Sequence, residues 1–191
     1  ASPYDAQRFE QFAVYPVSDK GIGQGTSIDL VPVGAPYAMP YRESFRLNTI
    51  VGVSTLEGAP NWEMVSDNKY EDIQSQDGDN VFLTFVDNVN ACRGRIYTGR
   101  ITVDENAQNP VFVYYFFGAN SNAVSEFQLY VDEGDGFKTV GNPYRATRGV
   151  FGEWNRVTAS MAPYKGKSIR LAIEISSPQA TAEAIDNMQL V

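Results

Sequence analysis

The chain has 191 residues, of which 23 are acidic and 15 are basic, so its formal net charge is −8. Without a run of Lys and Arg to release counterions from phosphates, the sequence argues against binding to nucleic acid or to anionic membrane surfaces. Histidine is absent, which removes the usual general base, the common Ser and Cys nucleophile systems and most zinc sites. The single cysteine, Cys92, cannot form a disulfide within the chain, and no apolar run is long enough to span a membrane. These absences argue against an enzyme and against membrane insertion.

Segments of strand length follow one another along the chain, some alternating between apolar and polar residues and others apolar throughout. They are Phe9 to Val17, Ser27 to Val33, Trp62 to Val65, Val81 to Val86, Arg95 to Val103, Val111 to Phe117, Glu126 to Val131, Phe137 to Val140, Trp154 to Ala159, Ser168 to Ile175 and Ala184 to Val191. Turn residues separate them, as in Asp77-Gly78-Asp79 and Asp135-Gly136. This pattern predicts an all-β fold, a two-sheet jelly-roll sandwich with at most one or two helical turns.

Two of these predicted strands differ in how apolar and charged residues are distributed between their two faces. In Ser168 to Ile175 apolar residues fall on one face and charged residues on the other, which predicts one core face and one solvated face. The strand Val111 to Phe117 is apolar on both faces. It is therefore either central and covered twice, or it displays Phe112, Tyr114 and Phe116. In the second case these rings would form a rigid binding surface for a sugar or a peptide.

A boundary is expected near Gly34-Ala35-Pro36, because three prolines within nine residues interrupt strand pairing there. Residues 1–36 hold only two good strands, and two strands are marginally stable by themselves. We therefore divide the chain into an N-terminal piece, residues 1–36, and a main domain, residues 37–191. The N-terminal piece must pack on the main domain or be the end of another domain.

The segment Phe12-Ala13-Val14-Tyr15-Pro16-Val17-Ser18-Asp19-Lys20-Gly21, with the strand that follows it, resembles the last two strands of a fibronectin type III domain. The main domain contains Pro40-Tyr41-Arg42-Glu43-Ser44-Phe45, Trp62, Trp154, Tyr164-Lys165-Gly166-Lys167 and Ile185-Asp186-Asn187-Met188. With these motifs it resembles the MAM-like jelly roll of bacterial surface proteins, a galactose-binding-like sandwich that includes the cleaved-adhesin and choice-of-anchor groups of Bacteroidetes. It lacks the disulfides of vertebrate MAM domains.

The resemblance implies a non-catalytic module of a secreted or cell-surface bacterial protein. Such a module serves cell adhesion, or recognises extracellular glycan or protein ligands, and is joined to other domains of the same polypeptide. Two alternatives remain: an accessory carbohydrate-binding module of an extracellular glycoside hydrolase, and a structural spacer. A hydrolase itself would need two carboxylates about 5 to 9.5 Å apart in a cleft, and no spacing in the sequence points to such a pair.

The resemblance also points to calcium, which takes six to eight oxygen ligands. In jelly rolls of this kind the first strand supplies a Glu and the last strand an Asp, and here those residues are Glu43 and Asp186. The acidic loop that contains Asp77 and Asp79 could supply further oxygens. Such an ion would be structural and would tie the two ends of the domain together. The alternative is that these acids are solvated or pair with Arg42 and Arg46.

Two remaining features are interpreted as structural. Trp62 and Trp154 each begin a strand and are expected to fill the core rather than to stack on sugars. The segment from Asp132 to Gly136 resembles the start of a calcium-binding loop, but it lacks the bidentate Glu that completes such a loop. A hairpin turn is therefore expected there.

Overall fold

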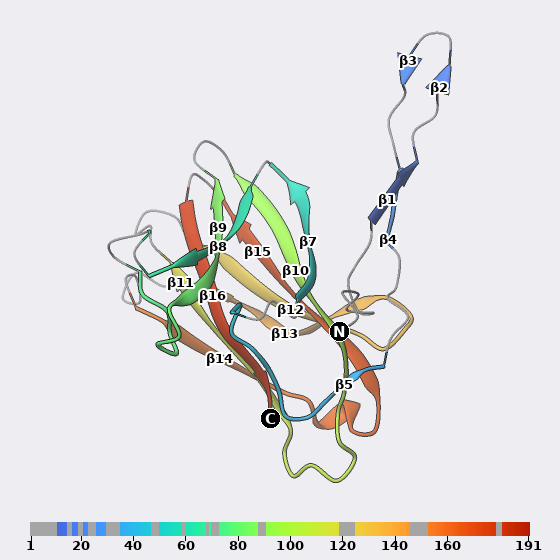
Figure 1. Cartoon of the computed structure of the whole chain (residues 1–191). Coiled ribbons are helices and arrows are strands. Elements are labelled where there is room, and N and C mark those ends of the chain that lie inside the picture. The colour runs from blue at the N-terminus through green and yellow to red at the C-terminus, as the bar shows by residue number, and fades with distance from the viewer. Residues whose placement is uncertain are drawn as a thin grey trace, which may run out of the picture.

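The structure is a computed structural model that describes residues 11–14, 17–18, 21–22, 26–29, 35–46, 50–58, 60–67, 69, 73–87, 91–118, 125–145, 153–178 and 181–191. Two six-stranded β-sheets face each other and form a sandwich (Figure 1). Within these residues the only helix is a short 3-10 turn, η1 (Ala162–Tyr164). No described helix is long and apolar enough to cross a membrane. The predicted all-β sandwich is confirmed.

Sheet 1 carries its strands in the order β13 (Phe137–Arg145), β12 (Glu126–Asp132), β15 (Ser168–Ser177), β10 (Cys92–Thr102) and β5 (Tyr37–Ala38), while β7 (Ile50–Glu57) also pairs with β10. The short strand β5 runs parallel to β10, and the other pairings are antiparallel.

Sheet 2 carries its strands in the order β14 (Asn155–Ser160), β11 (Val111–Gly118), β16 (Thr181–Leu190), β9 (Val81–Asp87) and β8 (Asn61–Ser66), while β6 (Tyr41–Glu43) also pairs with β16. All of these pairings are antiparallel. Because β6 and β16 are neighbours, the first and last strands of sheet 2 in chain order lie side by side.

The main core lies between the two sheets and is filled by the inward-facing residues of both. In β15 the alternate residues that the sequence assigns to the core are at most 1% exposed: Ile169, Leu171, Ile173 and Ile175. The two tryptophans, which were predicted to fill the core, are half-buried and pack against two different apolar clusters. Trp62 contacts Phe85 with ring centroids 4.6 Å apart, and Trp154 packs beside Phe82 on the outer face of sheet 2.

The N-terminal segment forms two short antiparallel pairs, β1 (Gln11–Val14) with β4 (Thr26–Asp29) and β2 (Val17–Ser18) with β3 (Gly21–Ile22). Among the described strands these four pair only with each other, and Figure 1 shows them extending away from the sandwich. The pairing agrees with the two strands expected there. The side chains of this segment lie outside the described residues, so its predicted packing on the main domain and its likeness to a fibronectin type III domain stay predictions.

Strand β7 is the main element that the sequence pattern did not predict. The apolar side chains of β7 that the structure describes do not face the core, since Val53 and Leu56 are each 43% exposed. A strand without a buried apolar face gives no alternation to detect, and Gly52 further weakens its strand character. Sheet pairing with β10 holds it in place.

Candidate functional site

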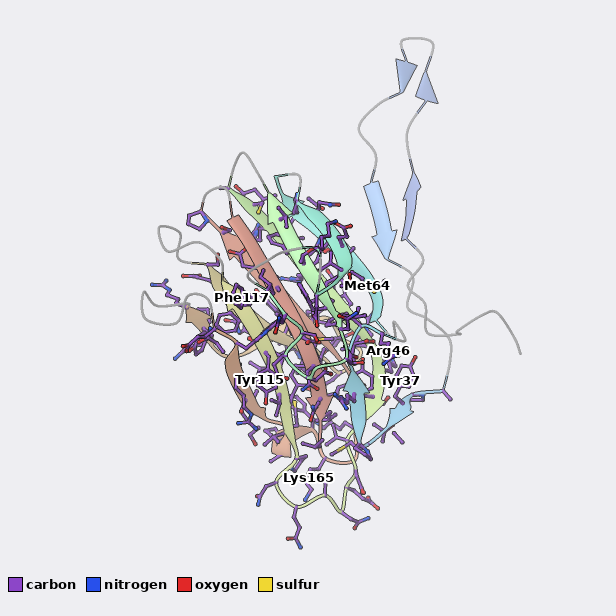
Figure 2. The ribbon with its side chains drawn as sticks, turned by 60° about the vertical axis from the view of Figure 1, so that its left-hand side comes forward. Tyr37, Arg46, Met64, Tyr115, Phe117 and Lys165 are labelled. Carbon is purple, nitrogen blue, oxygen red and sulfur yellow. The ribbon has the colours of Figure 1, made fainter. Side chains whose placement is uncertain are left out.

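The three rings predicted as a ligand-binding face belong to the core. Phe112 and Phe116 have no exposed surface and Tyr114 is 1% exposed. The opposite face of β11 is covered as well, since Phe117 is 3% exposed and packs beside Trp154; Figure 2 labels Phe117 on this strand. The prediction that Phe112, Tyr114 and Phe116 form an exposed binding surface is wrong, because β11 is a central strand covered on both sides. A central strand covered on both faces was the other arrangement that the sequence allowed for β11.

The outer face of sheet 1 carries a different set of aromatic and charged residues, arranged in three rows across the strands. Cross-strand register places Ser54, Arg95, Glu174 and Gln128 in the first row, Tyr97, Ala172, Tyr130 and Thr139 in the second, and Arg100, Arg170, Asp132 and Phe137 in the third. Residues directly opposite in neighbouring strands have adjacent side chains. Three aromatic rings and three arginines therefore share one face.

Glu174 organises the first row. It accepts a hydrogen bond from Arg95 Nε at 2.6 Å, and Arg93 lies 3.9 Å from its other oxygen. The guanidinium of Arg95 lies 4.0 Å from the centroid of the Tyr130 ring, a cation–π contact. Burial alone would lower the pKa of Arg95, but the hydrogen bond and the charge of Glu174 outweigh it and raise that pKa. In the second row the Tyr97 hydroxyl lies 2.9 Å from Ser54 Oγ.

Asp132 organises the third row. Its Oδ2 accepts hydrogen bonds from Arg170 Nη2 at 2.7 Å and Nε at 3.0 Å, and its Oδ1 accepts the N–H groups of Gly134 and Gly136. Burial alone would raise the pKa of Asp132, but these four donors lower it. The segment that looked like a calcium loop is thus a hairpin turn between β12 and β13, as predicted. Arg170 also lies 5.1 Å from the centroid of Phe137.

We call Arg95, Tyr97, Tyr130, Phe137 and Arg170 the arginine–tyrosine face. Tyr97 and Arg170 are nearly buried, whereas Tyr130 and Phe137 are half-buried and Arg95 keeps 21% of its side chain exposed. Ion pairs and cross-strand contacts hold every member in one geometry, so little conformational entropy remains to be lost on binding. The sequence contained a signal for four members of this face, because Arg95, Tyr97, Tyr130 and Arg170 alternate with the core residues of β10, β12 and β15.

The carboxylates predicted to bind calcium lie around the last strand of sheet 2. Asp186 has no exposed surface. Its Oδ2 accepts the N–H of Gln76 and its Oδ1 accepts the N–H of Asn187, each at 2.7 Å. Burial raises the pKa of Asp186 to about 7, and the charges of Asp77 and Asp79 also raise it, although both hydrogen bonds oppose the shift. The loop of residues 73–80 therefore brings two further acids within electrostatic range of a buried one.

Glu43 and Asp77 have protein partners of their own. Glu43 is 1% exposed and accepts the N–H of Phe45, and sheet register pairs it with Met188, two residues beyond Asp186. Asp77 forms an ion pair with Arg42 at 2.6 Å, so the arginine pairing expected as the alternative occurs for this acid.

The fit of this acidic region to calcium is partial. The donors are all hard oxygens, as calcium prefers, and the raised pKa of Asp186 reflects a buried negative charge that a cation would stabilise. Among the described residues, however, no three acidic side chains meet closely enough to hold a metal by themselves. A bound ion would need carbonyl and water oxygens besides Asp186.

A cleft of about 580 Å³ opens between β13 and β14, the edge strands of the two sheets. Its floor is formed by Tyr114, Phe127 and Leu129, and its walls by residues 140–144 and 157–160. Burial, and in addition the neighbouring Tyr144, raises the pKa of Tyr114. Tyr114 thus contributes to a cleft, although as a buried part of its floor and not as an exposed platform.

No protein-family model matches the sequence, and no curated protein matches it. Solved structures do match the fold. The K2 cleaved adhesin domain of Lys-gingipain has a TM-score of 0.57 at 11% identity, with 80% of this chain and 98% of that chain covered. The carbohydrate-binding module TmCBM61, solved with β-1,4-galactotriose, has a TM-score of 0.54 at 15% identity, with 73% and 86% covered. The CBM22-1 xylan-binding domain of Paenibacillus barcinonensis Xyn10C has a TM-score of 0.50 at 16% identity, with 82% and 96% covered. At these identities the likeness establishes the jelly-roll sandwich that adhesin domains and carbohydrate-binding modules share.

Proposed function

We propose that the chain is a non-catalytic, extracellular recognition module that binds a glycan on the arginine–tyrosine face. The observation that carries this proposal is the three-row arrangement of Tyr97, Tyr130 and Phe137 among Arg95 and Arg170. Aromatic rings supply apolar surface to the carbon faces of a sugar, and fixed guanidinium and carboxylate groups supply hydrogen bonds to its hydroxyls. Solved proteins of the same fold include a module bound to galactotriose and a xylan-binding domain, which supports a glycan as the ligand.

The charges of this face favour binding over hydrolysis. A glycosidase needs one carboxylic acid with a raised pKa beside a second carboxylate. Here Glu174 is held by Arg95 and Arg93, and Asp132 is held by Arg170 with its pKa lowered. Both acids therefore serve to fix arginines. The absence of histidine from the whole chain agrees with a non-catalytic role.

A glycan-binding series tests the proposal. The chain is titrated by calorimetry with β-1,4-galactan, xylan and other soluble polysaccharides, and the Tyr130→Ala variant is compared with Tyr115→Ala. Tyr115 is the matched control, since it is a half-buried tyrosine on the outer face of sheet 2 (Figure 2). We expect Tyr130→Ala to weaken binding by about tenfold, the effect of losing roughly one stacking contact of 1 to 2 kcal/mol, and Tyr115→Ala to leave it unchanged. Equal binding by both variants would place the site elsewhere.

A structural calcium ion beside Asp186, with Asp77, Asp79 and Glu43 near it, is the second part of the proposal. The buried carboxylate at the junction of the first and last strands supports it. The accessory module of a glycoside hydrolase is the second candidate function, since a structure of the same fold combines such a module with a xylanase domain.

A further inference from the structure

The cleft between β13 and β14 has a chemistry unlike that of the arginine–tyrosine face. None of its lining residues is charged, and its floor of Tyr114, Phe127 and Leu129 consists of core side chains that are at most 4% exposed. The rings in this floor do not present an open stacking surface. A sugar, which needs an exposed ring face and many hydrogen bonds, is poorly matched to such a floor, whereas an apolar side chain is well matched.

One wall of the cleft is a sheet edge with backbone groups directed outward. The N–H of Met161 donates to Pro110 at 2.8 Å, and the register between β11 and β14 continues without a break from Val111 and Ser160. Because alternate residues of an antiparallel strand turn their backbone groups to the same side, those of Arg156, Thr158 and Ser160 point away from β11. The part of the chain that the structure describes adds no further strand on that side.

The other wall is a bulge in β13. Sheet register pairs Phe127 with Tyr144 and Leu129 with Val140, so residues 141–143 stand opposite Gln128 alone. Gly141 adopts a φ of 66°, and a side chain added to it would meet nothing within 4 Å. The bulge interrupts the β12–β13 ladder and leaves this wall open beside the apolar floor.

Two exposed arginines flank the cleft, although the whole chain is acidic. Arg145 follows the lining residue Tyr144, Arg156 precedes the lining residue Val157, and both arginines are exposed. Glu126 pairs with Arg145, whereas Arg156 forms no ion pair with a described residue, so its guanidinium can attract an anionic partner to this edge.

From these observations we infer that the cleft binds an extended polypeptide segment of a partner protein, with alternating apolar residues and acidic flanks. The segment adds to the edge of β14, pairs with the outward backbone groups of Thr158 and Ser160, and inserts an apolar side chain onto Tyr114, Phe127 and Leu129. Strand addition of this kind takes its affinity from main-chain hydrogen bonds and its specificity from the pocket that receives alternate side chains. This site and ligand class are separate from the glycan site proposed above.

The test uses the full chain and a short synthetic peptide of alternating valine and threonine with glutamate at both ends. Thr158→Pro removes an outward N–H with which no described strand pairs, and proline is tolerated on edge strands. Thr158→Ala is the matched control, because it keeps that N–H. We expect the peptide to bind the wild type and Thr158→Ala equally, and to bind Thr158→Pro about tenfold more weakly. The two variants should melt at similar temperatures.

Further experiments distinguish the ligands that could bind in the cleft: an acidic peptide, a sugar or a second copy of this chain. A peptide with lysine in place of glutamate should bind more weakly, and backbone resonances of residues 140–144 and 157–160 should shift on titration with the acidic peptide. The inference is overturned if the acidic peptide does not bind, or if it binds Thr158→Pro as well as the wild type. It is also overturned if galactotriose displaces the peptide, which would make the cleft a sugar site. A wild-type dimer that Thr158→Pro dissociates would instead assign the edge to a second copy of this chain.

Discussion

Asp186 in the last strand accepts the backbone N–H of Gln76 at 2.7 Å and so joins two segments that are 110 residues apart in the sequence. The loop of residues 73–80 is held on the outer face of sheet 2 at a second point, where Trp154 Nε1 donates to the carbonyl of Gln74 at 2.8 Å. Ile73, the first residue of this loop, is itself buried against Phe82 and Phe117 in the second apolar cluster. The acidic loop is therefore a fixed part of the fold.

Replacing Trp154 by phenylalanine should lower the free energy of unfolding by about 1 kcal/mol more than replacing Trp62. Both changes remove similar ring volume, but only Trp154 loses a hydrogen bond. The Nε1 of Trp62 is buried without a hydrogen-bond partner among the described residues, so Trp62→Phe removes an unsatisfied donor. Urea denaturation of the two variants measures the difference. Equal losses would show that the bond to Gln74 contributes nothing.

The fold was predictable because most strands bury one face and therefore alternate in hydrophobicity. In β15 this alternation identified the core residues Ile169, Leu171, Ile173 and Ile175. The prediction that its other face is solvated is wrong, because Arg170 and Glu174 are only 7% and 8% exposed and form ion pairs with Asp132 and Arg95. It failed for β7, whose described apolar residues Val53 and Leu56 are exposed. It also could not decide whether β11 exposes a face, because an apolar strand that is covered on both sides has no polar face to mark it.

The candidate site was predictable only in part, because it depends on register between distant strands. Arg95, Tyr130 and Phe137 are ordinary outward-facing residues in the sequence, and only the pairing of β10, β15, β12 and β13 makes them neighbours. The proximity of Asp77 and Asp79 to Asp186 follows from the path of one loop. The resemblance to jelly rolls pointed to Glu43 and Asp186, and the acidic composition of the loop suggested Asp77 and Asp79 as further ligands.

The burial of the predicted binding rings leads to a stability prediction. Phe116→Ala should cost about 3 to 5 kcal/mol, because it opens a cavity where the ring stacks on Phe127 at a centroid distance of 4.2 Å. Met64→Ala, at a side chain that is 44% exposed, should cost less than about 0.5 kcal/mol. Chemical denaturation measures both. A loss of glycan binding with unchanged stability in Phe116→Ala would restore this ring to the binding surface.

The Asp132–Arg170 pair should make stability depend on acid pH. The pKa of Asp132 is lower in the folded chain than in the unfolded chain, so ionised Asp132 stabilises the fold above its unfolded pKa, and this stabilisation is lost as the pH falls through the folded pKa. Asp132→Asn leaves Arg170 buried without its carboxylate and should cost about 3 kcal/mol at neutral pH.

The difference in unfolding free energy between wild type and Asp132→Asn should therefore shrink as the pH is lowered from about 6 to about 3. Asp135→Asn is the control on the same turn. Its carboxylate is exposed and pairs only with Lys138 among the contacts described, so its removal should barely change stability at any pH. A wild-type advantage that stays constant with pH would show that Asp132 acts through hydrogen-bond geometry and not through its charge.

Calcium should raise the melting temperature of the wild type, and a chelator should lower it. An ion that binds only the folded chain stabilises it by RT ln(1 + [L]/Kd), about 2.7 kcal/mol at a hundredfold excess over Kd. Asp186→Asn keeps the side-chain volume but removes the buried charge, so it should lose most of this dependence, and Glu43→Gln should weaken it. Asp67→Asn is the matched control, because Asp67 holds the same loop through the N–H of Ser75 at 2.6 Å and is not one of the proposed ligands. Asp67→Asn should therefore keep its response to calcium even if its melting temperature falls. If the wild type melts at the same temperature in calcium and in chelator, the four acids act only through the protein contacts of the junction between the first and last strands.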